Sequence, residues 1–119
     1  MTVKNVINET YALLQRIGAV NSKNEFYKDW LNRSESYMRV LAFNNKQPST
    51  STLAICSSKL KYYANLLNRK DDISSKEVAV EFERLSEEID DIIYQQSKNE
   101  WTSKMILESK REDRIGVLA

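Results

Sequence analysis

The chain has no histidine, one cysteine, one proline and two glycines among its 119 residues. Without histidine there is no imidazole for acid–base catalysis, and with Cys56 as the sole thiol a zinc site would need carboxylates alone. A single cysteine also excludes a disulfide framework within the chain and favours a reducing, cytoplasmic setting. Scarce glycine and proline disfavour strands and tight turns, so the composition predicts an all-α fold.

Long apolar runs and catalytic motifs are also missing. No apolar run reaches the roughly 18 residues that a membrane span requires, and the N-terminal stretch MTVKNVINETY lacks the apolar core of a signal peptide. The sequence contains neither a glycine-rich phosphate loop nor a nucleophile elbow. We therefore expect no enzymatic activity, no metal, no cofactor and no membrane attachment.

Charge is distributed unevenly along the chain. Residues 1–70 carry 11 Lys/Arg and 4 Asp/Glu, a net charge of +7, whereas residues 71–119 carry 7 Lys/Arg and 13 Asp/Glu, a net charge of −6. These two halves predict a basic domain over residues 1–70 and an acidic helical extension over residues 71–119. Opposite charges favour different partners for the two parts, and the alternative is that both merely form solvated helix faces.

Apolar spacing predicts a series of helices over residues 3–17, 22–32 and 35–43, with a fourth after Ser49. A long acidic fifth helix would follow a polar turn over residues 68–75. The predicted caps at helix starts are Thr2, Ser22 with Glu25, Ser34, Ser49, and Ser74 or Ser75. The predicted stops are Gly18, Asn32 and the pair Asn44-Asn45, residues that tolerate a left-handed backbone.

Two further apolar patterns predict contacting surfaces. The fourth helix carries a second stripe at Ile55, Tyr62 and Leu66, beside the stripe that would face the core. The fifth helix repeats apolar residues at spacings of 4, 3, 4 and 3, a two-heptad seam that cannot be buried by the helix alone. Either surface could form a homodimer, or the seam could fold back onto the chain's own core. The seam consists of Val78, Phe82, Leu85, Ile89 and Ile92.

Residues 22–60 combine a short helix, a tight turn, a short helix, a proline-containing loop and another helix. This order and spacing resemble the helix-turn-helix of the Cro/cI repressor-like DNA-binding family. In that family a leucine–glycine pair closes the second helix, a serine caps the third, and a proline–serine pair opens the fourth. The similar positions here are Leu31-Asn32, Ser34, Met38, Pro48-Ser49, Leu53, Ser57 and Leu60, with Asn32 and Asn44 in place of the family's glycines.

The resemblance implies a small helical bundle that presents its third helix to the major groove of double-stranded DNA. By this resemblance Glu35, Ser36 and Arg39 fall on the outward side of that helix, and Tyr37 falls either there as a base contact or inward as a core aromatic. Arg39 would pair with guanine, Glu35 would accept from cytosine, and Ser36 could serve several bases. Phosphate contacts are expected at helix ends and loops, from Lys23, Arg33, Ser34, Asn44, Asn45 and Lys46.

Two functional hypotheses follow. The first is a sequence-specific transcriptional regulator of bacterial or phage type, acting as a homodimer because one helix-turn-helix covers only a few base pairs. The second is a helical protein-interaction module whose acidic residues 77–91 dock on a basic partner, as in a host-directed inhibitor or an antitoxin. The residues that would carry this second role are Glu87, Glu88, Asp90 and Asp91.

Overall fold

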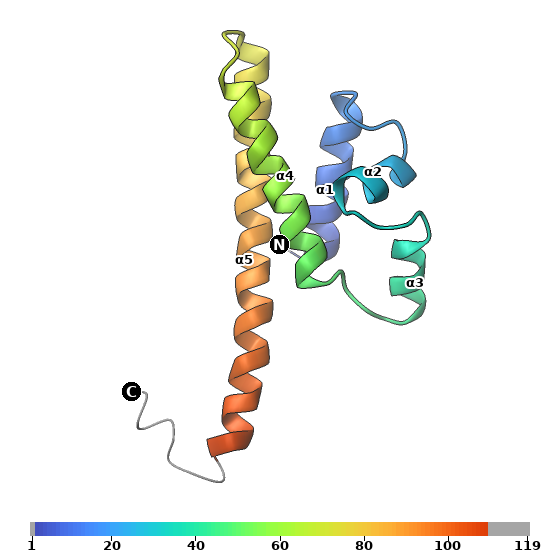
Figure 1. Cartoon of the computed structure of the whole chain (residues 1–119), viewed down its shortest axis with the longest axis vertical. Helices are drawn as coiled ribbons and strands as arrows, with labels where there is room; N and C mark the ends of the chain where they lie inside the picture. Colours follow the sequence, from blue (N-terminus) through green and yellow to red (C-terminus); the bar gives the residue numbers. More distant parts are fainter. Residues whose placement is uncertain (1, 110–119) are drawn as a thin grey trace.

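The computed structural model describes residues 2–109, and over this range the chain is helical without any strand (Figure 1). The all-α prediction and the long C-terminal helix are confirmed. At a rise of about 1.5 Å per residue the last helix is about 55 Å long, which accounts for the molecule's longest extent of 58 Å. The five helices are α1 (Val3–Arg16), α2 (Lys23–Trp30), α3 (Tyr37–Phe43), α4 (Thr50–Asn68) and α5 (Ile73–Ser109).

Three of the predicted helix starts are capped as expected. The hydroxyl groups of Thr2, Ser22 and Ser49 each accept a backbone N–H from the third residue beyond, at 3.1 to 3.2 Å. The carboxylate of Glu25 accepts the backbone N–H of Asn21, so it satisfies a donor just before α2. These contacts pair N–H groups that the first helical turn leaves without intrahelical acceptors.

The stops also follow the sequence. Gly18, Asn32 and Asn45 have φ angles of +79°, +56° and +53°, so each reverses the backbone immediately after a helix. After α3, the N–H of Lys46 bonds to the carbonyl of Leu41 at 2.8 Å, which is the six-to-one bond of a Schellman motif. Of the predicted pair, Asn45 rather than Asn44 takes the left-handed conformation.

Two predicted helix starts are wrong. α3 begins at Tyr37, not at residue 35, and its N-cap is Ser36, because the Ser34 hydroxyl lies 3.4 Å from the Ser36 hydroxyl instead of capping the helix. α5 begins at Ile73, and its cap is Asp72, whose carboxylate accepts the N–H of Ser75 at 2.9 Å. The hydrogen bonds from Ser75 lower the pKa of the Asp72 carboxyl.

α4 and α5 form an antiparallel hairpin, and their contact is the most extensive one between two helices of residues 2–109 (Figure 1). Small residues let the two helices approach closely: Ser57 and Ala64 on α4, and Ala79 and Ser86 on α5, are all at most 2% exposed. The buried apolar core combines this hairpin with α1, α2 and the segments that follow them, and consists of Val6, Ile7, Leu13, Leu14, Val20, Phe26, Trp30, Leu31, Leu53, Cys56, Leu60, Ala64, Ala79, Phe82, Leu85 and Ile89.

The seam of α5 folds back on the chain's own core. Phe82, Leu85 and Ile89 are at most 2% exposed, and Val78 and Ile92 pack against the same core from its margin. These five residues were candidates for a dimer interface. Of the two alternatives, dimerisation and fold-back, the structure shows fold-back for the three central residues, which are buried within the chain's own core.

Polar contacts link α4 to α5 at Ser57. The Ser57 hydroxyl lies 2.6 Å from a carboxylate oxygen of Asp90 and 3.2 Å from the carbonyl oxygen of Ser86. Lys61 pairs with the other oxygen of Asp90. Asp90 therefore stabilises the hairpin through contacts with α4. None of the helices in residues 2–109 is both long and apolar enough to span a bilayer.

Candidate nucleic-acid interface

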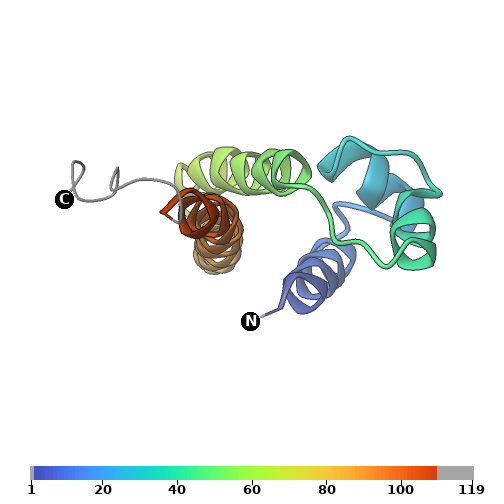
Figure 2. The same cartoon turned by 90° about the horizontal axis from the view of Figure 1, so that it is seen from below.

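α3 lies at one edge of the molecule, and the acidic helix α5 lies at the opposite edge (Figure 2). Tyr37 and Met38 pack partly against the core, and Leu41 is half-buried. No residue of α3 is fully buried. The helix therefore rests on the protein through one side and leaves its other side open to solvent.

The open side of α3 carries one cation and two large apolar groups. Arg39 is exposed, Val40 is 50% exposed and Phe43 is 89% exposed, the highest value among the exposed large apolar residues. Sequence reasoning singled out Arg39 and missed the other two. The signal was available, because residues 39, 40 and 43 share the helix face opposite Met38 and Leu41.

Arg33 braces the segment between α2 and α3 against α4. Its Nε donates to the Thr52 hydroxyl at 2.9 Å, and its Nη2 lies 3.4 Å from the Ser49 hydroxyl. The guanidinium also stands 5.2 Å from the centre of the Tyr37 ring, within cation–π range. Arg33 was predicted as a phosphate contact, and the structure gives it a positioning role at the start of α4.

Tyr37 faces inward. Its side chain is half-buried and its hydroxyl donates to the Thr52 hydroxyl at 3.2 Å, so ring and hydroxyl are both occupied inside the fold. Of the two placements open to Tyr37, the inward one is confirmed, and the outward, base-facing one is wrong. Thr52 accepts from both Arg33 and Tyr37, and this shared acceptor fixes the first turn of α3 relative to α4.

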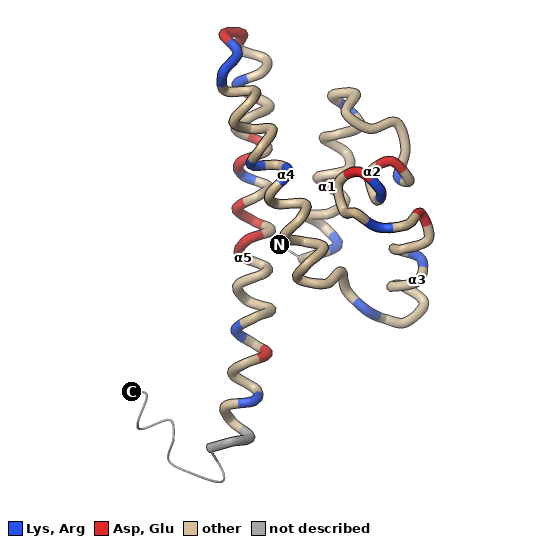
Figure 3. Tube along the Cα trace, viewed as in Figure 1, with Lys and Arg blue, Asp and Glu red and all other residues tan. Residues whose placement is uncertain are grey.

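Three predicted basic contacts remain open to solvent. Lys23 at the start of α2, Arg39 on α3 and Lys46 after α3 are exposed, and within residues 2–109 none of them forms an ion pair. Figure 3 shows basic positions on α3 and on the segments on either side of it, together with acidic positions on α2 and just before α3, and it shows acidic positions clustered along the upper half of α5. Residues 23–46 carry five Lys/Arg and three Asp/Glu, a net charge of +2, so the α3 side is basic only in net charge.

The polar residues around α3 are partly engaged in local contacts. The Glu35 carboxylate accepts from the Asn24 side-chain amide at 3.2 Å, and the Asn44 amide donates to the carbonyl of Val40 at 3.1 Å. Asn44 thereby caps the last turn of α3, while Asn45 is exposed. Ser36, the remaining predicted base contact, is half-buried at the start of the helix.

The second predicted dimer surface, on α4, is open to solvent. Tyr62 is 60% exposed, Leu66 is 36% exposed and Ile55 is half-buried on the outer side of α4. The Tyr62 ring packs edge-to-face on Tyr63 at 5.2 Å. These residues are free of the chain's own core and remain available to a partner.

The four acids of the protein-interaction hypothesis divide into two kinds. Glu88 pairs with Arg84 at 3.0 Å and Asp90 is held by Lys61, so both are used within the fold. Glu87 and Asp91 are exposed and form no ion pair within the described part of the chain. An acidic docking face on α5 would therefore rest on Glu87 and Asp91.

Neither a reactive thiol nor a metal-binding cluster is present in residues 2–109. Cys56 is fully buried, and burial raises the pKa of its thiol to about 12, so the nucleophilic thiolate is suppressed at neutral pH. No group of three or more acidic or cysteine side chains in this range converges as metal ligands would.

The comparison with known families matches residues 7–102, which run from α1 through most of α5. The chain belongs to this family, described as a family of unknown function (DUF6626). No curated protein and no solved structure matches the chain. The matched range includes every helix that contributes to the core.

Proposed function

We propose that this protein is a small DNA-binding regulator that places α3 in the major groove. The observation that supports this proposal is the presentation of α3: a short helix held at the edge of the fold, with Arg39 unpaired on its open side and the acid of α5 across the molecule. An α-helix with its side chains is about 10–12 Å in diameter, and the major groove is about 12 Å wide, so the groove admits a helix such as α3.

The exposed basic groups then have roles that their chemistry allows. Arg39 would donate to a guanine edge, while Lys23 and Lys46 would contact phosphates on either side of the groove. Arg33 would hold the turn so that α3 keeps its angle on the duplex. Ser36 and Glu35 would lie near the base edges at the start of the helix.

A single such domain covers few base pairs, so the regulator would act as a homodimer in the cytoplasm. Because the α5 seam is buried, the dimer would use the remaining predicted surface at Ile55, Tyr62 and Leu66. The mass of the protein in solution, measured with and without a duplex, tests the dimer separately from DNA recognition.

The test of the function is a selection from random duplexes at low salt, followed by affinity measurements on the enriched sequence. Replacing Arg39 with alanine should cost about 1–3 kcal/mol and relax the preference at one base position. Lys46→Ala should weaken binding to all sequences alike and reduce the salt slope by about one.

Arg69→Ala provides the matched control, since Arg69 is an exposed arginine at the other end of α4. It should change neither affinity nor base preference. A selection that enriches no sequence, with no duplex binding at low salt, would rule out the proposal.

A second candidate function has a specific observation in its favour. Glu87 and Asp91 are exposed on α5, and the large apolar residues Val80 and Tyr94 beside them are 63% and 61% exposed. A basic helical partner would match this surface. A stoichiometric partner that is lost when Glu87 and Asp91 are changed to their amides, together with no duplex binding, would favour this role over the regulator.

A further inference from the structure

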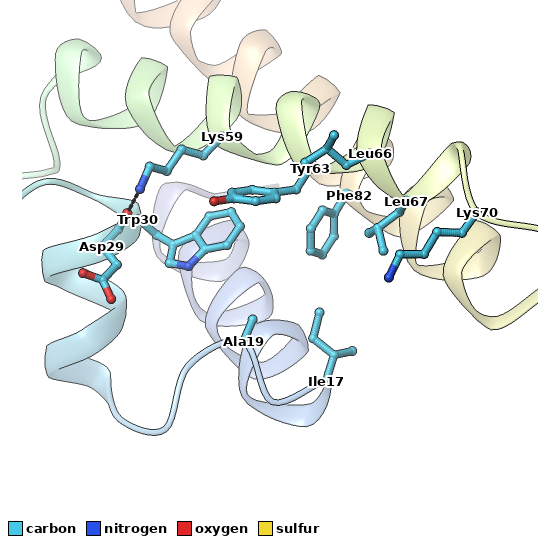
Figure 4. Close-up of a pocket in the computed structure, with 10 residues that line it drawn as sticks. All are labelled: Ile17, Ala19, Asp29, Trp30, Lys59, Tyr63, Leu66, Leu67, Lys70 and Phe82. Atoms are coloured by element: carbon cyan, nitrogen blue, oxygen red, sulfur yellow. Dashed lines mark hydrogen bonds between the residues drawn. The ribbon is translucent and has the colours of Figure 1, made fainter. Parts of the chain in front are cut away.

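A hollow of about 620 Å³ lies between the end of α1, the end of α2 and the α4–α5 hairpin (Figure 4). This volume is within the range of small-molecule binding sites, about 300–1,000 Å³. The hollow takes no part in the proposed contact with DNA, because its lining residues do not include any of α3. Its lining therefore needs a separate explanation.

Three aromatic side chains form one side of the hollow. Trp30 lies 5.4 Å from the ring centre of Tyr63 and 6.1 Å from that of Phe82. Trp30 and Phe82 are 7% and 2% exposed, so packing fixes them, while Tyr63 is 40% exposed at the rim. Tyr63 therefore offers most of the open aromatic surface, and a flat aromatic ring can stack or pack edge-to-face on it while it touches the exposed edges of Trp30 and Phe82.

The opposite side is aliphatic and open. Ile17 and Ala19, just after α1, lie across the hollow from the aromatic group (Figure 4). Ile17 is 39% exposed, and Tyr63 across from it is 40% exposed, while Leu66, which also borders the hollow, lies on the surface assigned above to the dimer. Exposed apolar groups converging on one hollow are typical of a site that a ligand covers.

Two lysines give the hollow its charge pattern. The Lys59 ammonium donates to the main-chain oxygen of Asp29 and lies 5.8 Å from the centre of the Trp30 ring. The Lys70 side chain reaches in from the other end (Figure 4), and among the described residues its ammonium has no hydrogen bond and no salt bridge. An anionic group at the Lys70 end would supply the missing partner.

We propose that this hollow binds a small aromatic anion, with its ring system against Trp30, Tyr63 and Phe82 and its acidic group at Lys70. The negative carboxylate of Asp29 lies beyond Trp30 (Figure 4), so the anion belongs at the Lys70 end. Trp30 is also the last residue of α2. If the proposed DNA-binding function holds, a ligand here contacts the helix that leads into α3 and is placed to act as an effector.

The experiment uses 1-anilinonaphthalene-8-sulfonate as the probe, because it combines a bicyclic ring system with one anionic group. The chain has two tryptophans, so Trp101→Phe leaves Trp30 as the sole tryptophan. The full-length variant is titrated without DNA. The expected result is a saturable rise of probe fluorescence at one site per chain, with a matching loss of Trp30 emission by energy transfer.

Further variants test the charge and the position. Lys70→Gln should weaken binding of the probe about threefold to fivefold, as expected for a partly exposed ion pair, whereas Lys104→Gln should change nothing. The uncharged analogue N-phenyl-1-naphthylamine should bind both lysine variants equally. Ala19→Phe should fill the hollow and abolish saturable binding of both probes, with helix content unchanged.

Several outcomes would overturn this inference. They are non-saturating fluorescence without loss of Trp30 emission, and equal probe affinity of the Lys70→Gln and Lys104→Gln variants. Exclusion of the probe from a protein of twice the chain mass would show that a second copy occupies the hollow instead. Because no DNA is present in the titration, these results are independent of the proposed function.

Discussion

At the scale of single residues, two asparagines with a left-handed backbone lie in the turns before and after α3 and set its direction. Asn32 and Asn45 both have φ near +55°, a conformation that costs most other residues about 1–2 kcal/mol. Asparagine and glycine tolerate it best, because a short polar side chain or none at all avoids the clash with the backbone. The angle between α2 and α3 therefore depends on a residue type that can be recognised in the sequence.

Replacing Asn32 with alanine should lower the free energy of unfolding by about 1–2 kcal/mol, because the left-handed backbone is retained at a steric cost. Asn32→Gly should leave the stability within about 0.5 kcal/mol of the parent. Denaturant unfolding measures both. Asn65, an exposed residue inside α4, is the control: Asn65→Ala should be neutral or slightly stabilising, since alanine favours a helix. An equal loss from both alanine variants would contradict this account of Asn32.

At the scale of elements, α5 has one side in the core and another in solvent along the same helix. Its inner side closes the hairpin with α4, and its outer side presents Val80, Tyr94 and Trp101, which are 52–63% exposed. The spacing of 4, 3, 4 and 3 correctly identified the inner side. It could not name the covering helix, since a heptad seam is satisfied equally by α4 or by a second chain.

Leu85→Ala should lower the free energy of unfolding by about 2–5 kcal/mol, because it removes fully buried methyl groups and leaves a cavity. Val80→Ala, on the exposed side of the same helix, should change it by less than about 0.5 kcal/mol. The loss caused by Leu85→Ala should be the same at low and high protein concentration. A loss that grows on dilution would show instead that the seam stabilises a dimer.

At the scale of the whole molecule, the net charges of the two edges differ in sign. Residues 23–46 carry five Lys/Arg and three Asp/Glu, a net charge of +2, and residues 73–109 carry four Lys/Arg and nine Asp/Glu, a net charge of −5. Lys23, Arg39 and Lys46 on the α3 side and Glu87 and Asp91 on the α5 side form no ion pair within residues 2–109. Such a separation orients the protein as it approaches a polyanion, because one edge is attracted and the other is repelled. It also explains how a chain with a net charge of only +1 could approach DNA.

Changing Glu87 to glutamine and Asp91 to asparagine together should raise the association rate with duplex DNA about twofold or more at roughly 0.01 M salt, where the Debye length is about 30 Å. At about 0.15 M salt the screening length is near 8 Å, and the difference should disappear because α5 lies far from the bound edge. Stopped-flow fluorescence with a labelled duplex measures the rates. An increase that persists at high salt would place these acids near the DNA.

Features set by near neighbours were predictable. The caps Ser22 and Ser49, the left-handed Asn32 and the inward Met38 all follow from contacts within a few residues, which composition and spacing record. Ser34 and Ser74 or Ser75 were wrong as caps because several serines and an aspartate lay within two or three residues of one another. Each can accept a backbone N–H in principle, yet only Asp72 does so, because the hydroxyls of Ser34 and Ser36 contact each other and neither caps α3.

The candidate site was predicted in part. Lys23, Arg39 and Lys46 are open to solvent as expected, but Tyr37 turns inward and Arg33 is occupied by Thr52 and Ser49. The helical period places Tyr37 between the two faces of α3, so its direction depended on a hydroxyl of α4 that lies 15 residues away. A hydrogen bond between side chains this far apart in the sequence produces no pattern among the neighbouring residues from which it could be predicted.

The sequence by itself determined the helical class, most helix boundaries, the left-handed turns and which side of each helix is apolar, because these depend on local sterics and periodicity. Tertiary structure alone decided that α5 covers its seam with α4, that Asp90 is bound by Ser57 and Lys61, and that Phe43 stands in solvent. It also assembled the hollow around Trp30 from α2, α4, α5 and the segment that follows α1. An apolar stripe specifies that a surface must be buried, and only the packed chain specifies against what.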